Sequence, residues 1–203
     1  MTADAAGKRV KYVLILASLL LSAFVLVAWT QTWLSAGLAE GFPWPVVVVQ
    51  HRSKEPGSEL CKYLQRCCRR NVSEPEDKEP IMAGRVYLAP RDYHLLVERG
   101  NFALSTEAPV YFARPSIDVL FESAADAYGA GVVGVVLTGA NGDGARGLAR
   151  IKAAGGVAVV QDPSTARAPE MPRAAIEAAD VDRVLPLPEI APFLNGLGRE
   201  AAR

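Results

Sequence analysis

Two residues that follow apolar runs could act together as the histidine and the aspartate of a nucleophilic hydrolase. His51, one of only two histidines in the chain, directly follows the β-branched run 46–50. Asp143 lies in a Gly- and Asn-rich turn after a second apolar run, 131–137. In hydrolases of this class a histidine takes the proton of the nucleophile and a carboxylate orients the histidine. The alternative for His51 is a polar residue at the start of a loop, without a catalytic role.

Both apolar runs have the composition of buried strands in a parallel sheet. They are rich in valine, they end at turn residues, and they are too short to span a membrane. The carboxyl ends of the strands in an open α/β sheet form the crevice in which ligands bind. We therefore expect His51 and Asp143 at that edge of the sheet.

Strand and helix patterns alternate along most of the chain, which predicts an α/β fold with a doubly wound, mostly parallel sheet and flanking helices. Two short runs around a Gly-Asn turn predict a small antiparallel hairpin, 94–97 with 102–104. The acidic stretch 71–78 predicts a solvated loop. Further strands are expected at 84–90, 157–161 and 184–185. Helices are expected at 58–70, from the N-cap Ser116 to Gly129, through Leu148 and Ile151, and at 171–178.

The first 41 residues are atypical of such a fold. Residues 12–29 are almost wholly apolar and follow a basic segment, so hydropathy predicts a membrane anchor or the hydrophobic part of a signal peptide. The competing interpretation is a buried first strand, 12–16, that leads into a buried crossover helix. We therefore expect an atypical apolar segment, 1–41, in front of a catalytic-type domain, 42–203.

The length and composition of the chain argue against several kinds of partner and ligand. With 203 residues the chain fits one domain, and its 22 basic residues equal its 22 acidic residues, so no nucleic-acid partner is expected. The histidines and cysteines do not cluster as ligands would, so no metal is expected. The glycine-rich stretch 139–144 lacks the Lys-Ser/Thr of a phosphate-binding loop and the spacing of a dinucleotide site, so no cofactor is expected.

Six motifs of this chain have the order and spacing of the catalytic domain of CheB, the bacterial chemotaxis methylesterase, and the chain resembles that family from about residue 42 to 195. They are Val48-Val49-Gln50-His51, Val86-Tyr87-Leu88-Ala89-Pro90 with His94 after it, Arg114-Pro115-Ser116-Ile117-Asp118, Leu137-Thr138-Gly139 through Asp143-Gly144, Gln161-Asp162, and Met171-Pro172-Arg173-Ala174-Ala175. The resemblance implies a cytoplasmic enzyme with a Ser/His/Asp triad. It implies as substrates the glutamate methyl esters on the cytoplasmic helices of chemoreceptors, with release of methanol.

The resemblance also implies roles for individual residues. His51 and Asp143 fall on the histidine and the aspartate of the triad, and the backbone amide of Ala140 falls on the oxyanion hole. For His94 a structural hydrogen bond is favoured over catalysis. Arg114 and Asp118 either shape a receptor-binding face or cap and pair at the start of a helix, and the structural role is favoured.

The nucleophile motif of the family, a strand followed by Gly-Ala-Ser-x-Gly-Gly, is degraded here. The nearest match is 15–21, which keeps Ala17-Ser18 and has leucine where the family has glycine after the serine. Leucine does not adopt positive φ cheaply, and it keeps backbone amides away from a reacting oxygen. Ser18 is the expected nucleophile and Ser22 is the other hydroxyl near it. A frameshifted or replaced start of an ordinary enzyme is the alternative.

The resemblance and the degraded nucleophile motif together leave two candidate functions, one enzymatic and one of binding only. The first is a protein-glutamate methylesterase, with glutamine deamidase activity as the family implies. The second is a catalytically inactive homologue that binds receptor helices, anchored in the inner membrane through residues 12–29 with its domain in the cytoplasm. Typical members of the family carry a receiver domain in front, for which this chain has no room, so a stand-alone methylesterase domain is expected.

Overall fold

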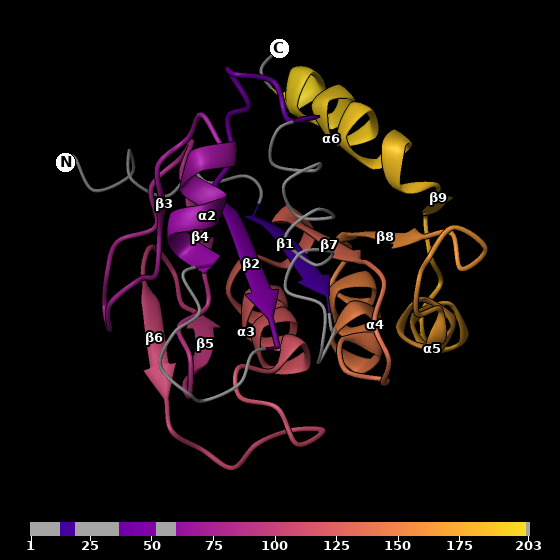
Figure 1. Cartoon of the computed structure of the whole chain (residues 1–203), viewed down its shortest axis with the longest axis horizontal. Coiled ribbons are helices and arrows are strands. Elements are labelled where there is room, and N and C mark those ends of the chain that lie inside the picture. The colour runs from indigo at the N-terminus through magenta and orange to yellow at the C-terminus, as the bar shows by residue number, and fades with distance from the viewer. Residues whose placement is uncertain (1–12, 19–36, 52–59, 202–203) are drawn as a thin grey trace, which may run out of the picture.

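Short valine-rich segments form the sheet at the centre of the molecule (Figure 1). The computed structural model describes the backbone of residues 13–18, 37–51 and 60–201, with side chains from residue 37 to 200. Within these residues seven strands form one parallel sheet in the order β3-β4-β2-β1-β7-β8-β9. The strands are β1 (Val13–Ser18), β2 (Val46–Gln50), β3 (Val72–Ser73), β4 (Val86–Leu88), β7 (Val132–Val136), β8 (Val157–Gln161) and β9 (Arg183–Leu185).

Strand β1 lies in the middle of this sheet. It pairs with β2 on one side, where Ser18 is in register with Gln50, and with β7 on the other, where Ala17 is in register with Val136. The chain runs outward from β1 through β2 to the edge strand β3, inserts β4 between β2 and β3, and then crosses over to add β7, β8 and β9 on the opposite side of β1. Such a reversal of strand order is where open α/β sheets bind ligands, beyond the carboxyl ends of the strands.

Helices cover both faces of the sheet, as expected from the alternating pattern (Figure 1). Successive residues of a strand point to opposite faces, so in β2 Val47 and Val49 pack with α3, α4 and α5, whereas Val46 and Val48 pack with α2 and α6. The helices are α2 (Leu60–Cys67), α3 (Ile117–Tyr128), the 3-10 turn η1 (Gly129–Gly131), α4 (Ala145–Ala153), α5 (Glu170–Ala178) and α6 (Leu187–Ala201).

A two-stranded antiparallel hairpin stands apart from the main sheet and packs against α3. Its strands are β5 (His94–Val97) and β6 (Phe102–Ser105), and Leu95, Val97 and Phe102 join the same apolar core as α3. The predicted fold class is confirmed, including the hairpin and the cap of α3 by Ser116.

Two elements differ from the expectations. A short edge strand, β3, lies within the stretch predicted as a solvated loop, and it pairs with β4. Helix α6 was not predicted, and Pro192 within it explains why, because proline normally ends a helix.

The apolar amino-terminal run is described only in part. Residues 13–18 form a central strand, which agrees with the first strand proposed for this region. The membrane span expected at 12–29 lies mostly outside the described residues. Among the helices that are described, none is long and apolar enough to cross a bilayer. The boundary after residue 41 stays a prediction.

Candidate active site

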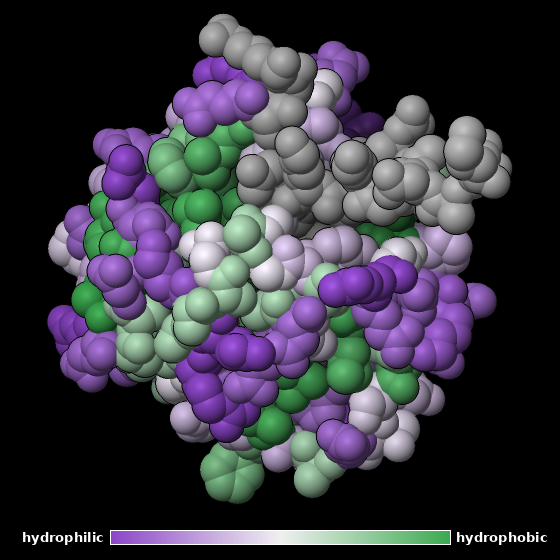
Figure 2. Space-filling model, turned by 180° about the vertical axis from the view of Figure 1, so that it is seen from behind, coloured by the Kyte–Doolittle hydropathy of each residue, from purple (hydrophilic) through white to green (hydrophobic). Residues whose placement is uncertain are grey.

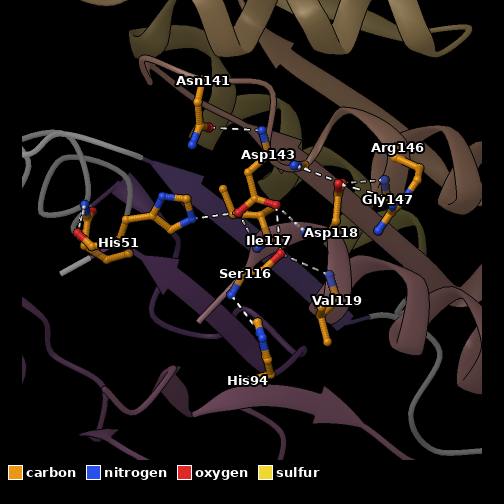
Figure 3. Close-up of polar contacts among 12 residues, drawn as sticks. His51, His94, Ser116, Ile117, Asp118, Val119, Asn141, Asp143, Arg146 and Gly147 are labelled. Carbon is orange, nitrogen blue, oxygen red and sulfur yellow. Dashed lines mark hydrogen bonds and ion pairs between the residues drawn. The ribbon is translucent and has the colours of Figure 1, made fainter. Parts of the chain in front are cut away.

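His51 and Asp143 meet at the carboxyl edge of the sheet (Figure 3). His51 directly follows β2, and Asp143 lies in the turn between β7 and α4. The His51 Nε2 atom is 2.6 Å from Asp143 Oδ2. His51 is 6% exposed and Asp143 is fully buried. The two side chains therefore form a hydrogen-bonded pair screened from water, although 92 residues separate them in the sequence.

The amino terminus of α3 holds the Asp143 carboxylate from the other side (Figure 3). The hydroxyl of Ser116 donates to Oδ1 at 2.8 Å, the amide of Ile117 donates to Oδ2 at 2.8 Å, and the amide of Asp118 donates to Oδ1 at 3.0 Å. The first amides of a helix have no partner within the helix, and they carry its positive dipole end, so they suit a carboxylate. With His51, each carboxylate oxygen accepts two hydrogen bonds.

These hydrogen bonds keep Asp143 ionised. Burial alone would raise the pKa of its carboxyl, but the hydrogen bond and charge of His51, with the amides of Asp118 and Ile117, outweigh burial and hold that pKa below its usual value. Asp143 is therefore a carboxylate near neutral pH, and an ionised carboxylate can only accept hydrogen bonds.

The ionised Asp143 carboxylate determines which ring nitrogen of His51 carries the proton. Because the carboxylate accepts at Nε2, the neutral imidazole carries its proton on Nε2 and its lone pair on Nδ1. Nδ1 is buried and has no hydrogen-bond partner among the residues that the structure describes, and it points away from Asp143 (Figure 3). The geometry leaves Nδ1 as the ring atom that could accept a proton from another group.

A second buried carboxylate, Asp118, lies beside the first. Its Oδ1 accepts hydrogen bonds from the amides of Gly144 at 2.9 Å and Gly147 at 2.8 Å, which fixes the start of α4 next to Asp143. Its Oδ2 accepts no hydrogen bond from the described part of the chain, and the Arg146 guanidinium is 3.9 Å away. Burial raises the pKa of Asp118 in spite of the two amides. Asp118 thus serves the start of α4, which agrees with the favoured structural role.

The substitution Asp118→Asn tests whether folding raises the pKa of Asp118. A group whose pKa is raised by folding gives its full contribution to stability below its unfolded pKa, and that contribution is lost as the pH rises. Asparagine can still accept both amide hydrogen bonds and cannot ionise. We therefore expect the free energy of unfolding of the variant, relative to wild type, to increase between pH 4 and pH 7 in urea titrations. A difference that stays constant or decreases over this range would contradict the assignment.

Ser116→Ala should destabilise the protein by about 2–3 kcal/mol, because a buried carboxylate loses a donor and α3 loses its cap to the amide of Val119. This corresponds to a decrease in Tm of about 4–12 °C in a chain of this size. Ser164→Ala, at an exposed serine, is the matched control and should leave Tm within about 2 °C. Equal Tm values for the two variants would show that Ser116 does not hold Asp143.

Ser18, the expected nucleophile, is the last residue of β1, and its backbone is in register with the residue before His51. The backbone at position 18 is therefore at the same edge as the histidine and the aspartate. The side chain of Ser18 and the whole of Ser22 lie outside the described residues.

The turn expected to form the oxyanion hole is anchored at Gly139, directly before Ala140. Gly139 donates to the carbonyl of Ala168 and accepts from the amide of Met171, both at 2.9 Å. A Cβ atom at position 139 would lie 2.6 Å from Met171 Cε and 3.0 Å from Met171 Cβ, so any other residue would force the Met171 side chain to move. Ala140 is exposed, and its amide bonds no acceptor among the described residues. This amide is available to a ligand.

Two other predicted positions have structural partners. His94 accepts from the amide of Ser116 at 3.2 Å and donates to the carbonyl of Ala108 at 3.1 Å. Arg114 binds Asp92 at 2.7 Å and donates to two backbone carbonyls of the loop before it. In the described part of the chain no His, Cys, Asp or Glu side chains gather as a metal site would. Sequence reasoning treated Ser116 only as a cap and missed its bond to Asp143.

A family model, described as CheB methylesterase, matches residues 30–194. The chain belongs to the CheB methylesterase family. The match covers His51, Asp143 and the Ala140 turn, and it begins after β1 and Ser18.

Individual members of the CheB methylesterase family are similar to this chain in sequence and in structure. A Leptospira interrogans protein provisionally named protein-glutamate methylesterase/protein-glutamine glutaminase is 51% identical over 148 residues, which cover 72% of this chain and 77% of that protein. An Anaeromyxobacter dehalogenans protein of the same name, numbered 2, is 44% identical over 80% of this chain and 48% of its own length. The crystal structure of the Thermotoga maritima CheB methylesterase catalytic domain is 31% identical, with a TM-score of 0.82, and the match covers 92% of this chain and 97% of that one.

Proposed function

We propose that this chain hydrolyses glutamate methyl esters on chemoreceptor proteins and releases methanol, with Ser18, His51 and Asp143 as its triad. The observation that carries the proposal is the buried His51–Asp143 pair at the sheet edge where β1 ends in Ser18. Relatives named protein-glutamate methylesterase support the substrate class. The site of action is the cytoplasm, where the methylated helices of chemoreceptors lie.

In the first half of the reaction His51 Nδ1 takes the proton of the Ser18 hydroxyl while the serine oxygen attacks the ester carbonyl. Asp143 holds the proton on Nε2 and stabilises the imidazolium that forms. The carbonyl oxygen gains negative charge and accepts a hydrogen bond from the Ala140 amide. The C–O bond to methoxide then breaks, and His51 returns its proton so that methanol leaves.

In the second half the γ-glutamyl ester on Ser18 is hydrolysed. His51 deprotonates a water molecule, the hydroxide adds to the acyl carbon, and the bond to Ser18 breaks with return of the proton to the serine oxygen. The products are a free glutamate side chain and the starting enzyme. The same sequence on a glutamine amide would release ammonia, which corresponds to the glutaminase activity in the names of the relatives.

A second candidate is a receptor-binding homologue without catalysis. The observations that favour it are the family match, which begins only at residue 30, and the leucines that follow Ser18 in place of glycines. In this view residues 1–41 are a segment distinct from a methylesterase-type domain over 42–203. The coding DNA distinguishes a native segment from a frameshift, because a frameshifted start would contain a Gly-Ala-Ser-x-Gly-Gly turn in another frame.

One experiment separates the two functions. The purified chain is incubated with a methylated chemoreceptor fragment, and methanol release and receptor binding are measured on the same preparation. The enzyme is expected to release methanol in proportion to its concentration. Binding without methanol would support the inactive homologue, and neither binding nor methanol would overturn both.

A further inference from the structure

Two aromatic residues occupy the tip of a tight turn in the loop that precedes α3. Val110 and Ala113 exchange two backbone hydrogen bonds, at 3.1 and 2.9 Å, across Tyr111 and Phe112. Both central residues have positive φ, 49° at Tyr111 and 60° at Phe112. Positive φ at both central positions defines a type I′ turn, for which Asn-Gly is strongly preferred. Large side chains are strained in this region of backbone space.

Folding does not explain this choice of residues. The Phe112 side chain is 105% exposed and Tyr111 is 52% exposed, so the phenyl ring of Phe112 contributes nothing to either apolar core. The loop that carries them extends beyond the rest of the ribbon at the bottom of Figure 1, and Figure 2 shows hydrophobic atoms that protrude at this lower edge. Strained backbone without a structural gain is typical of functional positions.

The tip lies against the turn that carries Asp143. A methyl group built on Gly142 would be 3.7 Å from Tyr111 Oη and 3.8 Å from its ring. Gly142 is the residue before Asp143 and follows the exposed Ala140 by two positions. Arg146, three positions after Asp143 at the start of α4, is 64% exposed and pairs with Glu122 at 2.5 Å. The tip thus lies against the turn that carries Ala140 and Asp143, which leads into α4 and Arg146.

We propose that the Tyr111–Phe112 tip docks the polypeptide that carries the esterified glutamate, with Phe112 inserted between side chains on the apolar face of that helix. This inference rests on the proposed function and names the surface through which the site meets its substrate. A helix is about 10–12 Å wide with its side chains. A helix that presents a side chain to His51 would therefore also cover the contact between Tyr111 and Gly142.

The chemistry of the tip and of Arg146 fits this occupant. Exposed aromatic side chains are common anchors in protein interfaces, and amphipathic helices bind through apolar residues spaced one turn apart. A segment rich in glutamate also carries negative charge, and the Arg146 guanidinium, which pairs through Nε with Glu122 at 2.5 Å, is 64% exposed and can accept a second carboxylate. The tip therefore selects for a helix with an apolar face and acidic neighbours, rather than for a free small ester.

The double variant Tyr111→Asn/Phe112→Gly separates docking from folding, because it restores the residues that the turn prefers. We expect Tm to increase by at least about 2 °C as strain is released. We expect the Kd for a methylated cytoplasmic fragment of a chemoreceptor to increase at least tenfold. Phe112→Ser, at a fully exposed position, provides a second variant if the double variant folds poorly, and it should weaken binding in the same direction.

Met82→Ser is the matched control, because Met82 is 52% exposed in the turn before β4, at the amino edge of the sheet. It should leave the Kd within twofold of wild type. Unchanged binding by both tip variants would overturn the proposal, and so would a wild-type dimer that the tip variants dissociate, because a second copy would then be the occupant. Hydrolysis of a small ester by the wild type is measured separately, so its absence would count against the proposed function while the binding result still tests the tip.

Discussion

Ser18→Ala is expected to lower kcat for methyl-ester hydrolysis by about 10⁶, which leaves a residual rate above that of the uncatalysed reaction from the oxyanion hole and substrate binding. Loss of the nucleophile removes the covalent route, whereas the loss of one oxyanion donor costs only about 10²–10³. Ser18 ends the central strand in register with Gln50, so its backbone is at the edge where His51 and Asp143 meet. Methanol release from a methylated receptor fragment measures the effect.

Ser22→Ala is the control for this result, since Ser22 is the other hydroxyl near the end of β1. It should retain kcat within about twofold of wild type. The reverse outcome, with Ser22→Ala inactive and Ser18→Ala active, would transfer the role of nucleophile to Ser22. Retained activity in both variants would refute a serine nucleophile in this segment.

Asp143→Asn is expected to lower kcat by about 10⁴, because an amide cannot maintain the required tautomer of His51. If the amide NH₂ faces the ring, Nε2 must become the acceptor, so the proton moves to Nδ1 and blocks the atom that should take the serine proton. If the amide oxygen faces the ring, the NH₂ group takes the place of Oδ1. It then faces the backbone amide of Asp118, which is also a donor. In either orientation the variant loses one of the hydrogen bonds that the buried Asp143 carboxylate accepts.

The matched control is Asp126→Asn, on the exposed side of α3, where the carboxylate pairs with Arg150 at 2.6 Å. Its kcat should equal that of wild type. Circular dichroism of Asp143→Asn at the assay temperature establishes that the variant is folded, since it is also expected to be less stable. A folded Asp143→Asn enzyme with kcat within tenfold of wild type would contradict the role of Asp143.

Much of the fold could be predicted because parallel strands have a distinctive composition. The valine runs before His51 and Asp143 identified β2 and β7, and the rule that carboxyl ends meet at one edge predicted that the two side chains would be neighbours. The hairpin and the cap of α3 followed from local turn and capping signals. These features depend on residues close together in the sequence.

The features that were missed depend on contacts between distant segments. The bond from Ser116 to Asp143 joins residues 27 positions apart, and no local pattern indicates it. The raised pKa of Asp118 follows from burial, which tertiary packing alone determines. The apolar run at 12–29 was ambiguous because a membrane span and a buried strand with its helix have the same composition. Pairing of residues 13–18 in the sheet favours the strand for that portion.

Covalent labelling of the nucleophile tests the mechanism most directly. The 203-residue chain is treated with a fluorophosphonate, which phosphonylates a serine activated by a neighbouring base, and the modified peptide is sequenced by mass spectrometry. The triad predicts one adduct on the Ser18 oxygen, and its formation should be slowed at least a hundredfold by His51→Ala. An adduct on any other residue, or no adduct on a preparation that releases methanol, would contradict the proposed triad.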